Sequence, residues 1–267
     1  MSRRTSPALW AWLAAGFAFL YIPILSLVFF SFNQSKLVTV WGGFSTRWYA
    51  ALMRNEQILG AAWLSVKIAA ISAVLAVILG TLVAVCLTRF GPFRGRVKTE
   101  VLTGLSLLLL FVAMEQAFGW PAGRGTLTII IAHTTFALAY VAVVVQSRLT
   151  GMDPSIEEAA MDLGARPAKV FFLITLPIIM PALVSGFLLA FTLSLDDLVI
   201  SSFVSGPGST TLPMVIYSKV RLGLSPEINA LATLLVVVVA IGVIAAGLVL
   251  KQADQARQRD AKMAASK

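Results

Sequence analysis

The chain is poor in the side chains that most often do chemistry. Its 267 residues include one cysteine, Cys86, and one histidine, His133. A lone cysteine excludes an internal disulfide and a thiolate metal cluster. With one histidine and no H-E-x-x-H motif, the sequence assembles no acid, base, nucleophile or metal set, so we expect no catalytic residue and no metal site. We interpret His133 as a hydrogen-bonded residue of helix packing.

Charge is scarce as well. Charged residues make up 12% of the chain, against about 25% in an average soluble domain. Apolar residues make up 58%, and the mean hydropathy is +0.89. The apolar residues form long runs separated by short polar stretches. These features predict an all-α polytopic membrane protein with a single transmembrane domain over residues 1–267.

Six runs approach the length of about 20 apolar residues that a membrane-spanning helix needs. They cover residues 9–32, 60–88, 101–117, 126–147, 170–195 and 226–250. Ser2-Arg3-Arg4 before the first run loosely resembles a twin-arginine signal. That run is longer than the apolar core of about 7–15 residues in a signal peptide, so we expect a retained first helix.

The basic residues predict the orientation. The chain carries a formal charge of +9, but its Lys and Arg residues stand at the ends of apolar runs, so we read them as topological signals and expect no nucleic-acid partner. With six spans, fourteen of them fall on the side of the N-terminus and six on the other side. The positive-inside rule then places both termini and the basic tail 252–267 in the cytoplasm.

The most informative polar segment follows the fourth run and reads MDPSIEEAAMDLGARPAKVFFLITLPIIMP over 152–181. A helix can start here with Asp153-Pro154 as cap, or with Ser155 and Glu158 as a capping box. Gly164 allows a left-handed helix end, and Arg166-Pro167 can open a second helix. The first helix has an apolar stripe of Ile156, Ala159, Ala160 and Leu163. Such a helix docks into a groove of a cytoplasmic protein or lies on the lipid surface, and periodicity alone leaves both open.

The same segment carries a family motif. Glu158-Ala159-Ala160, Gly164 and Ile174-x-Leu176-Pro177 match all seven fixed positions of the loop E-A-A-x3-G-x9-I-x-L-P. In this the chain resembles the permeases of binding-protein-dependent ABC importers. The resemblance implies the type I importer permease fold in a bacterial inner membrane. It also implies that segment 152–170 is a coupling loop that docks into a cleft of the ATPase subunit, with Glu158 for polar contact and Gly164 for the bend.

The coupling residues implied by the resemblance are Glu157, Glu158, Ala159, Ala160, Asp162, Gly164, Arg166 and Pro167. The implied partners are a second permease, a dimer of the cytoplasmic ATPase and a periplasmic binding protein. ATP and Mg would belong to the ATPase, since this chain has no G-x-x-x-x-G-K-[ST] loop, and we expect no cofactor in it. An ion-coupled secondary transporter is disfavoured because the sequence shows no internal duplication.

Further stretches resemble the putrescine and spermidine permeases of that family. They are SFNQSKLVTVWGGFSTRWY at 31–49, TRFGPFRGR at 88–96, LSLDDLVISSFVSGPGSTTLPM at 193–214 and SPEINALATL at 225–234. A permease for another solute is the alternative, because the coupling loop is shared. In those relatives a further apolar stretch precedes the residues that match 100–104. The third run would therefore reach about 25 Å, short of a hydrocarbon core of about 30 Å. Either this helix is re-entrant or residues of the natural chain are absent around 96–101.

Three carboxylates are candidates for contact with the cargo. Asp196 and Asp197 close the fifth run at its outer end, where a carboxylate opposes the helix dipole and calls for a cation. A polyamine would supply that cation. Alternatively, the pair caps the following stretch or binds Lys219 or Arg221. Glu115 near the outer end of the third run is a further candidate, with interfacial solvation as the alternative. The segment 196–225 is too apolar for an exposed loop and is predicted to be re-entrant or partly helical.

Overall fold

The computed structural model describes residues 7–36, 40–89, 104–223 and 226–241. Within these ranges the secondary structure is helical, apart from an isolated bridge between Asn33 and Phe44. The helices are α1 (Pro7–Ser31), α2 (Arg47–Arg54), α3 (Glu56–Arg89), α4 (Gly104–Phe118), α5 (Thr126–Thr150), α6 (Ser155–Asp162), α7 (Pro167–Val170), the π-helical segment η1 (Phe171–Thr175), α8 (Leu176–Leu195), α9 (Val199–Val204) and α10 (Leu212–Leu222). The all-α prediction is confirmed for this part of the chain.

Each of the six predicted spans contains a helix. Four helices are long and apolar enough to cross a membrane, namely Trp10–Ser31, Glu56–Arg89, Thr126–Thr150 and Pro167–Leu195. Two are shorter as described, Leu109–Phe118 and Pro226–Ile241. The 15 residues of α4 correspond to about 22 Å of helix at 1.5 Å per residue. The predicted gap around 96–101, the end of the sixth span and the tail 252–267 lie outside the described residues.

The chain divides into two compact units, and the first comprises Met1–Glu56 with Ser218–Lys267. Its outer loop is organised by Asn33, whose side chain is 1% exposed. The Asn33 amide donates to the carbonyl of Val40 (2.7 Å), and its oxygen accepts from the N–H of Gly42 (2.8 Å). Trp48 Nε1 donates to the Asn33 carbonyl at 2.7 Å. The loop after α1 is therefore held by hydrogen bonds to Asn33.

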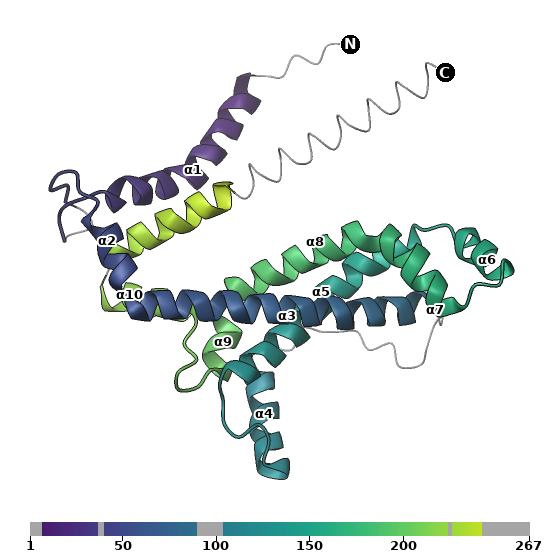
Figure 1. The fold of residues 1–267 in the computed structure, drawn as a ribbon. Helices are drawn as coiled ribbons and strands as arrows, with labels where there is room; N and C mark the ends of the chain where they lie inside the picture. The colour runs from purple at the N-terminus through teal and green to yellow at the C-terminus, as the bar shows by residue number, and fades with distance from the viewer. Residues whose placement is uncertain (1–6, 37–39, 90–103, 224–225, 242–267) are drawn as a thin grey trace. The chain divides into compact units, whose positions relative to one another are not determined.

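The second unit, Gln57–Tyr217, contains the candidate coupling loop and the candidate cargo carboxylates. Its core lies where α3, α5 and α8 run alongside one another (Figure 1). Val141 of α5 is fully buried between Gly80 of α3 and Gly186 of α8. The rest of this core is mostly alanine and valine: Ala73, Ala76, Ala84, Ala137, Val145, Leu149, Ile179 and Ala190. Small side chains let helix backbones approach closely, which is the usual packing mode in lipid.

A second apolar cluster joins α4 and α9 to this bundle. It consists of Ile68, Phe111, Ile129, Ala132, Ile200 and Val204. Phe111 is the anchor of α4 in this cluster, at 3% exposed. The cluster places the short helix α9 against α4 and α5, beside the outer end of α8.

The segment after α8 forms two short helices, α9 and α10, as the sequence predicts. Side chains from the long helices satisfy backbone groups at their ends. The Thr128 hydroxyl lies 2.7 Å from the carbonyl of Val204 at the end of α9. The first N–H of α10, on Leu212, donates to Ser65 Oγ at 2.7 Å. Because buried backbone polar groups need partners, these bonds allow irregular chain to pack inside the bundle.

The close contact at Gly80 provides a test of the packing. A Cβ there would stand 2.9 Å from Val141 Cγ1 and 3.2 Å from the backbone nitrogen of Ala142. We expect Gly80→Ala to lower the free energy of unfolding in detergent by about 1–3 kcal/mol through overpacking. Gly60→Ala is the matched control on α3, since nothing lies within 4 Å of its Cβ position. That control should be neutral or stabilising by up to about 1 kcal/mol. Equal thermal unfolding of both variants would contradict the packing described.

Candidate functional site: the projecting loop and the outer carboxylates

Asp153 starts helix α6. Its Oδ1 accepts a hydrogen bond from the backbone N–H of Ser155 at 3.0 Å. This backbone bond, together with the Ser155 hydroxyl, lowers the pKa of Asp153 below its ordinary value. Of the two starts that the sequence left open, the structure uses the one with Asp153.

The end of α6 depends on Gly164. Its φ of +83° lies in the left-handed region, where a Cβ is unfavourable. The N–H of Gly164 donates to the Met161 carbonyl (2.8 Å), and that of Ala165 donates to the Ala160 carbonyl (3.1 Å). Arg166 is then extended, and Pro167 opens α7. The predicted succession of helix, bend and second helix is therefore present.

Helix α6 projects from the bundle and buries none of its residues. It lies at the end of α5 and α8 that is remote from α9 (Figure 1). The loop exposes three large apolar side chains, Ile156 (45%), Met161 (43%) and Leu163 (90%). The side chains of Glu158 and Asp162 are exposed beside them. This surface is apolar in the middle and acidic at its edge, and within the described chain nothing covers it.

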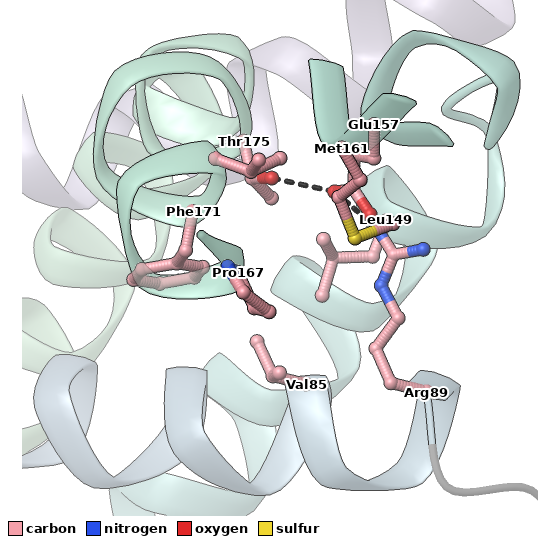
Figure 2. Close-up of a pocket in the computed structure, with 9 residues that line it drawn as sticks. Val85, Arg89, Leu149, Glu157, Met161, Pro167, Phe171 and Thr175 are labelled. Atoms are coloured by element: carbon pink, nitrogen blue, oxygen red, sulfur yellow. Dashed lines mark hydrogen bonds and ion pairs between the residues drawn. The ribbon is translucent and has the colours of Figure 1, made fainter. Parts of the chain in front are cut away.

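Glu157 differs from its neighbour Glu158. Its carboxylate turns towards the bundle, where it forms an ion pair with Arg89 at the end of α3 (Figure 2). The same carboxylate accepts a hydrogen bond of 2.5 Å from the hydroxyl of Thr175 in η1. Sequence reasoning grouped Glu157 with the outward coupling residues and missed Arg89 and Thr175. The available signal was the helical period, since consecutive residues point about 100° apart.

A pocket of about 210 Å³ lies behind this contact, between the projecting loop and the bundle. Figure 2 shows its lining residues from α3, α5, α6, α7 and η1. They are Val85, Arg89, Leu149, Glu157, Met161, Pro167, Val170, Phe171 and Thr175. Apart from Arg89, Glu157 and Thr175, the lining is apolar.

The π-helical segment η1 interrupts the helix that leads from the loop into the span. The ring of a proline clashes with the carbonyl four residues earlier, which for Pro177 is the carbonyl of Leu173. The wider turn over Phe171–Thr175 falls at this place. Local departures of this kind are frequent at functional sites. Thr175, the last residue of this segment, is the one that bonds Glu157.

At the opposite end of the bundle, Asp197 stabilises the start of α9. Its Oδ2 accepts the N–H of Ser201 at 2.8 Å, and its Oδ1 accepts the N–H of Ile200 at 3.4 Å. Asp197 thus caps α9, which is one of the alternatives that the sequence left open. Its Oδ2 also lies 3.3 Å from His133 Nε2.

His133 is 2% exposed and connects three helices. Its Nδ1 lies 2.6 Å from Ser194 Oγ of α8, and its Nε2 lies 3.1 Å from Ser201 Oγ of α9. The expected hydrogen-bonded packing residue is therefore found. The sequence did not reveal that Asp197 is one of its partners, because the two residues are brought together only by the packing of α5 against α8 and α9.

The other candidates remain accessible. Asp196 is exposed, and no described residue engages its carboxylate. Glu115 is exposed on α4. Lys219 pairs with Glu227 at 3.9 Å. Among the described residues no group of three or more His, Cys, Asp or Glu side chains comes together to hold a metal.

Comparison with known proteins agrees with this architecture. The chain is 60% identical to the putrescine transport system permease protein PotI of Escherichia coli K12, over 94% of each chain. It is 41% identical to the spermidine/putrescine transport system permease protein PotC of the same strain, over 94% of this chain and 96% of that protein. A crystal structure of a bacterial ABC transporter involved in import of the polysaccharide alginate has the same fold. Its TM-score is 0.65 at 16% identity, covering 90% of this chain and 93% of that one.

A family model matches almost the whole sequence as well. Residues 7–259 match the model described as binding-protein-dependent transport system inner membrane component. The match includes the projecting loop, Asp196 and Asp197, and the helices that carry them. The chain therefore belongs to the family of inner membrane components of binding-protein-dependent transport systems.

Proposed function

We propose that this chain is the permease subunit of an ATP-driven importer that moves a polyamine, putrescine or spermidine, into the cytoplasm. The observation that carries the proposal is the projecting helix α6 with its exposed apolar side chains and E-A-A motif. Exposed apolar side chains on a projecting helix indicate a surface that a partner protein or the lipid surface covers. The family supplies the partner, a cytoplasmic ATPase.

Docking of the loop would be driven largely by burial of its apolar side chains. Covering one leucine contributes about 1.5–3 kcal/mol. Leu163, at 90% exposed, has nearly its full side chain left to bury. Glu158 and Asp162 would make polar contacts at the edge of the groove. Gly164 and Arg166-Pro167 set the angle at which the loop leaves the bundle.

The proposed importer needs three further partners: a second permease, an ATPase dimer and a periplasmic binding protein. Only 17% of the residues in the 18-residue apolar window of the span Pro167–Leu195 are buried within the described chain, which leaves apolar surface for lipid and for a second permease. ATP and Mg would be bound by the ATPase dimer. A periplasmic binding protein would deliver the cargo from outside. The excess of Lys and Arg on one side supports cytoplasmic termini, with α6 on that same side.

The cargo proposal has two supports. Two relatives with 60% and 41% identity are named for putrescine and spermidine transport. Asp196 supplies an exposed carboxylate without a partner at the outer end of α8. A carboxylate at this depth calls for a cation, and polyamines carry several ammonium groups. Asp197 would contribute indirectly, since it is engaged by α9 and His133. Glu115 on α4 stays a candidate for the same pathway.

Transport would follow alternating access. Closure of the ATPase dimer on ATP would move the docked α6, and the bundle would change the side on which its central path is open. This chain would line part of the central path and would receive the movement through α6, while ATP hydrolysis takes place in the ATPase subunit.

The docking proposal predicts a selective loss of ATPase binding. We expect Leu163→Ser to weaken binding of the purified ATPase subunit about tenfold or more, because about 1.5–3 kcal/mol of apolar burial is removed. The matched control is Leu222→Ser on α10, since Leu222 is also 90% exposed. Binding of the ATPase to the permease pair in nanodiscs measures both. Equal affinities for the two variants would place α6 on the lipid surface instead.

The cargo proposal predicts different consequences for the two neighbouring aspartates. Asp196→Asn should lower the maximal rate of ATP-driven putrescine uptake into proteoliposomes by roughly tenfold. The reason is that a cation about 4 Å from a carboxylate gains about 1–4 kcal/mol. Its thermal stability should be unchanged. Asp197→Asn should lower the unfolding temperature, because hydrogen bonds to a charged group contribute about 1.5–3 kcal/mol each.

The wild-type complex provides the reference for that assay. The complete importer, with second permease, ATPase and binding protein, is tested with labelled putrescine and with spermidine. Absence of uptake of both amines, with ATPase binding intact, would leave the importer role standing and overturn the polyamine cargo.

A further inference from the structure

Glu157 is the inward-facing charged side chain of an otherwise exposed helix. No residue of α6 is buried, yet the Glu157 side chain is only 13% exposed. Its neighbour Glu158 is open to solvent. Two adjacent glutamates of one loop therefore face different surroundings, and only Glu158 is free to meet an ATPase.

The Glu157 carboxylate joins three separate elements. From α6 it reaches the guanidinium of Arg89, which stands at the end of the 34-residue helix α3. It also accepts the hydroxyl hydrogen bond of Thr175 in η1, at 2.5 Å. Thr175 is 3% exposed, so this end of the contact is shielded from water. The contact thus links the projecting helix to the start of α8 and to α3 (Figure 2).

Little else attaches α6 to the bundle. The pocket of about 210 Å³ lies between the loop and the ends of α3 and α5. A helix with no buried residue and a hollow behind it is not held by continuous packing. The ion pair of Glu157 with Arg89 at its rim therefore connects α6 directly to α3.

We propose that Arg89, Glu157 and Thr175 form a clasp that transmits movement of α6 to α3 and α8 during the transport cycle. This inference rests on the proposed function and deepens it, since it separates two roles within the projecting loop. Glu158 meets the ATPase, whereas Glu157 holds the helix to the spans that must move. Arg89 and Thr175 are positioning residues, and neither touches ATP or cargo.

The variants for the test remove one partner at a time. Glu157→Gln keeps the size of the side chain and removes its charge. Arg89→Gln removes the positive charge and shortens the side chain, and Thr175→Val removes the hydroxyl at similar shape. Arg148→Gln is the matched control, because Arg148 is an exposed arginine in the last turn of α5 whose Nε donates to the Ile178 carbonyl at 3.5 Å. All variants are examined in the complete complex with its second permease, ATPase and binding protein.

The decisive readout is the amount of putrescine taken up per ATP hydrolysed, at equal amounts of assembled complex. We expect Arg89→Gln and Glu157→Gln each to lower this ratio about fivefold, while Arg148→Gln leaves it unchanged. The double variant should be no worse than either single one, since both break the same contact. The reversal Arg89→Glu/Glu157→Arg should recover at least half of the loss seen with either single reversal. The clasp would be overturned if the losses of uptake per ATP in the two single variants added up in the double variant. It would also be overturned if the loss disappeared once uptake was compared at equal amounts of assembled complex.

A second readout does not depend on cargo. Hydrogen exchange of the amides of residues 155–163 in the intact complex should become about tenfold faster in Arg89→Gln and Thr175→Val, but not in Arg148→Gln. Failure of wild-type uptake together with this acceleration would refute the polyamine proposal and support the attachment of α6 by the clasp. Normal uptake per ATP and unchanged exchange in the variants would refute the clasp alone.

Discussion

The structure depends on one constraint: backbone polar groups that leave the regular helical pattern inside a bundle must find partners in the protein. Hydrocarbon offers none, and each unsatisfied group would cost several kcal/mol. The segment after α8 meets this constraint with side chains of the long helices. Thr128 serves the end of α9, Ser65 serves the first N–H of α10, and Asp197 serves the start of α9. These bonds let two short helices pack where a membrane protein would otherwise need an uninterrupted span.

The same constraint gives the two outer aspartates different tasks. Asp197 is taken up by the start of α9 and by His133, so its negative charge is already matched by donors. Asp196 is left with its carboxylate exposed. At the other end of the bundle, the adjacent Glu157 and Glu158 differ in a similar way. In each pair one carboxylate builds the fold, and its neighbour stays available to a partner.

The proposed coupling requires that a small projecting helix move long membrane helices. Packing alone would transmit this movement poorly, because α6 buries no residue and a pocket lies behind it. A charge-assisted contact, shielded on one side by Thr175, provides a connection that is directional and can be broken by single substitutions. Thr175 is the last residue of the π-helical turn.

The sequence by itself determined the membrane class, the six helical runs, the bend at Gly164 and the family motif. Each of these follows from hydropathy, local backbone preference or spacing along the chain. It also predicted that His133 would be a packing residue, and it gave capping of the following stretch as one alternative for the two aspartates. Only the tertiary structure decided that Asp197 meets His133, that Glu157 meets Arg89, and that Glu158 and Asp196 remain exposed. Partners that stand 64 or 68 residues apart share no local pattern, and only helix packing brings them within bonding distance.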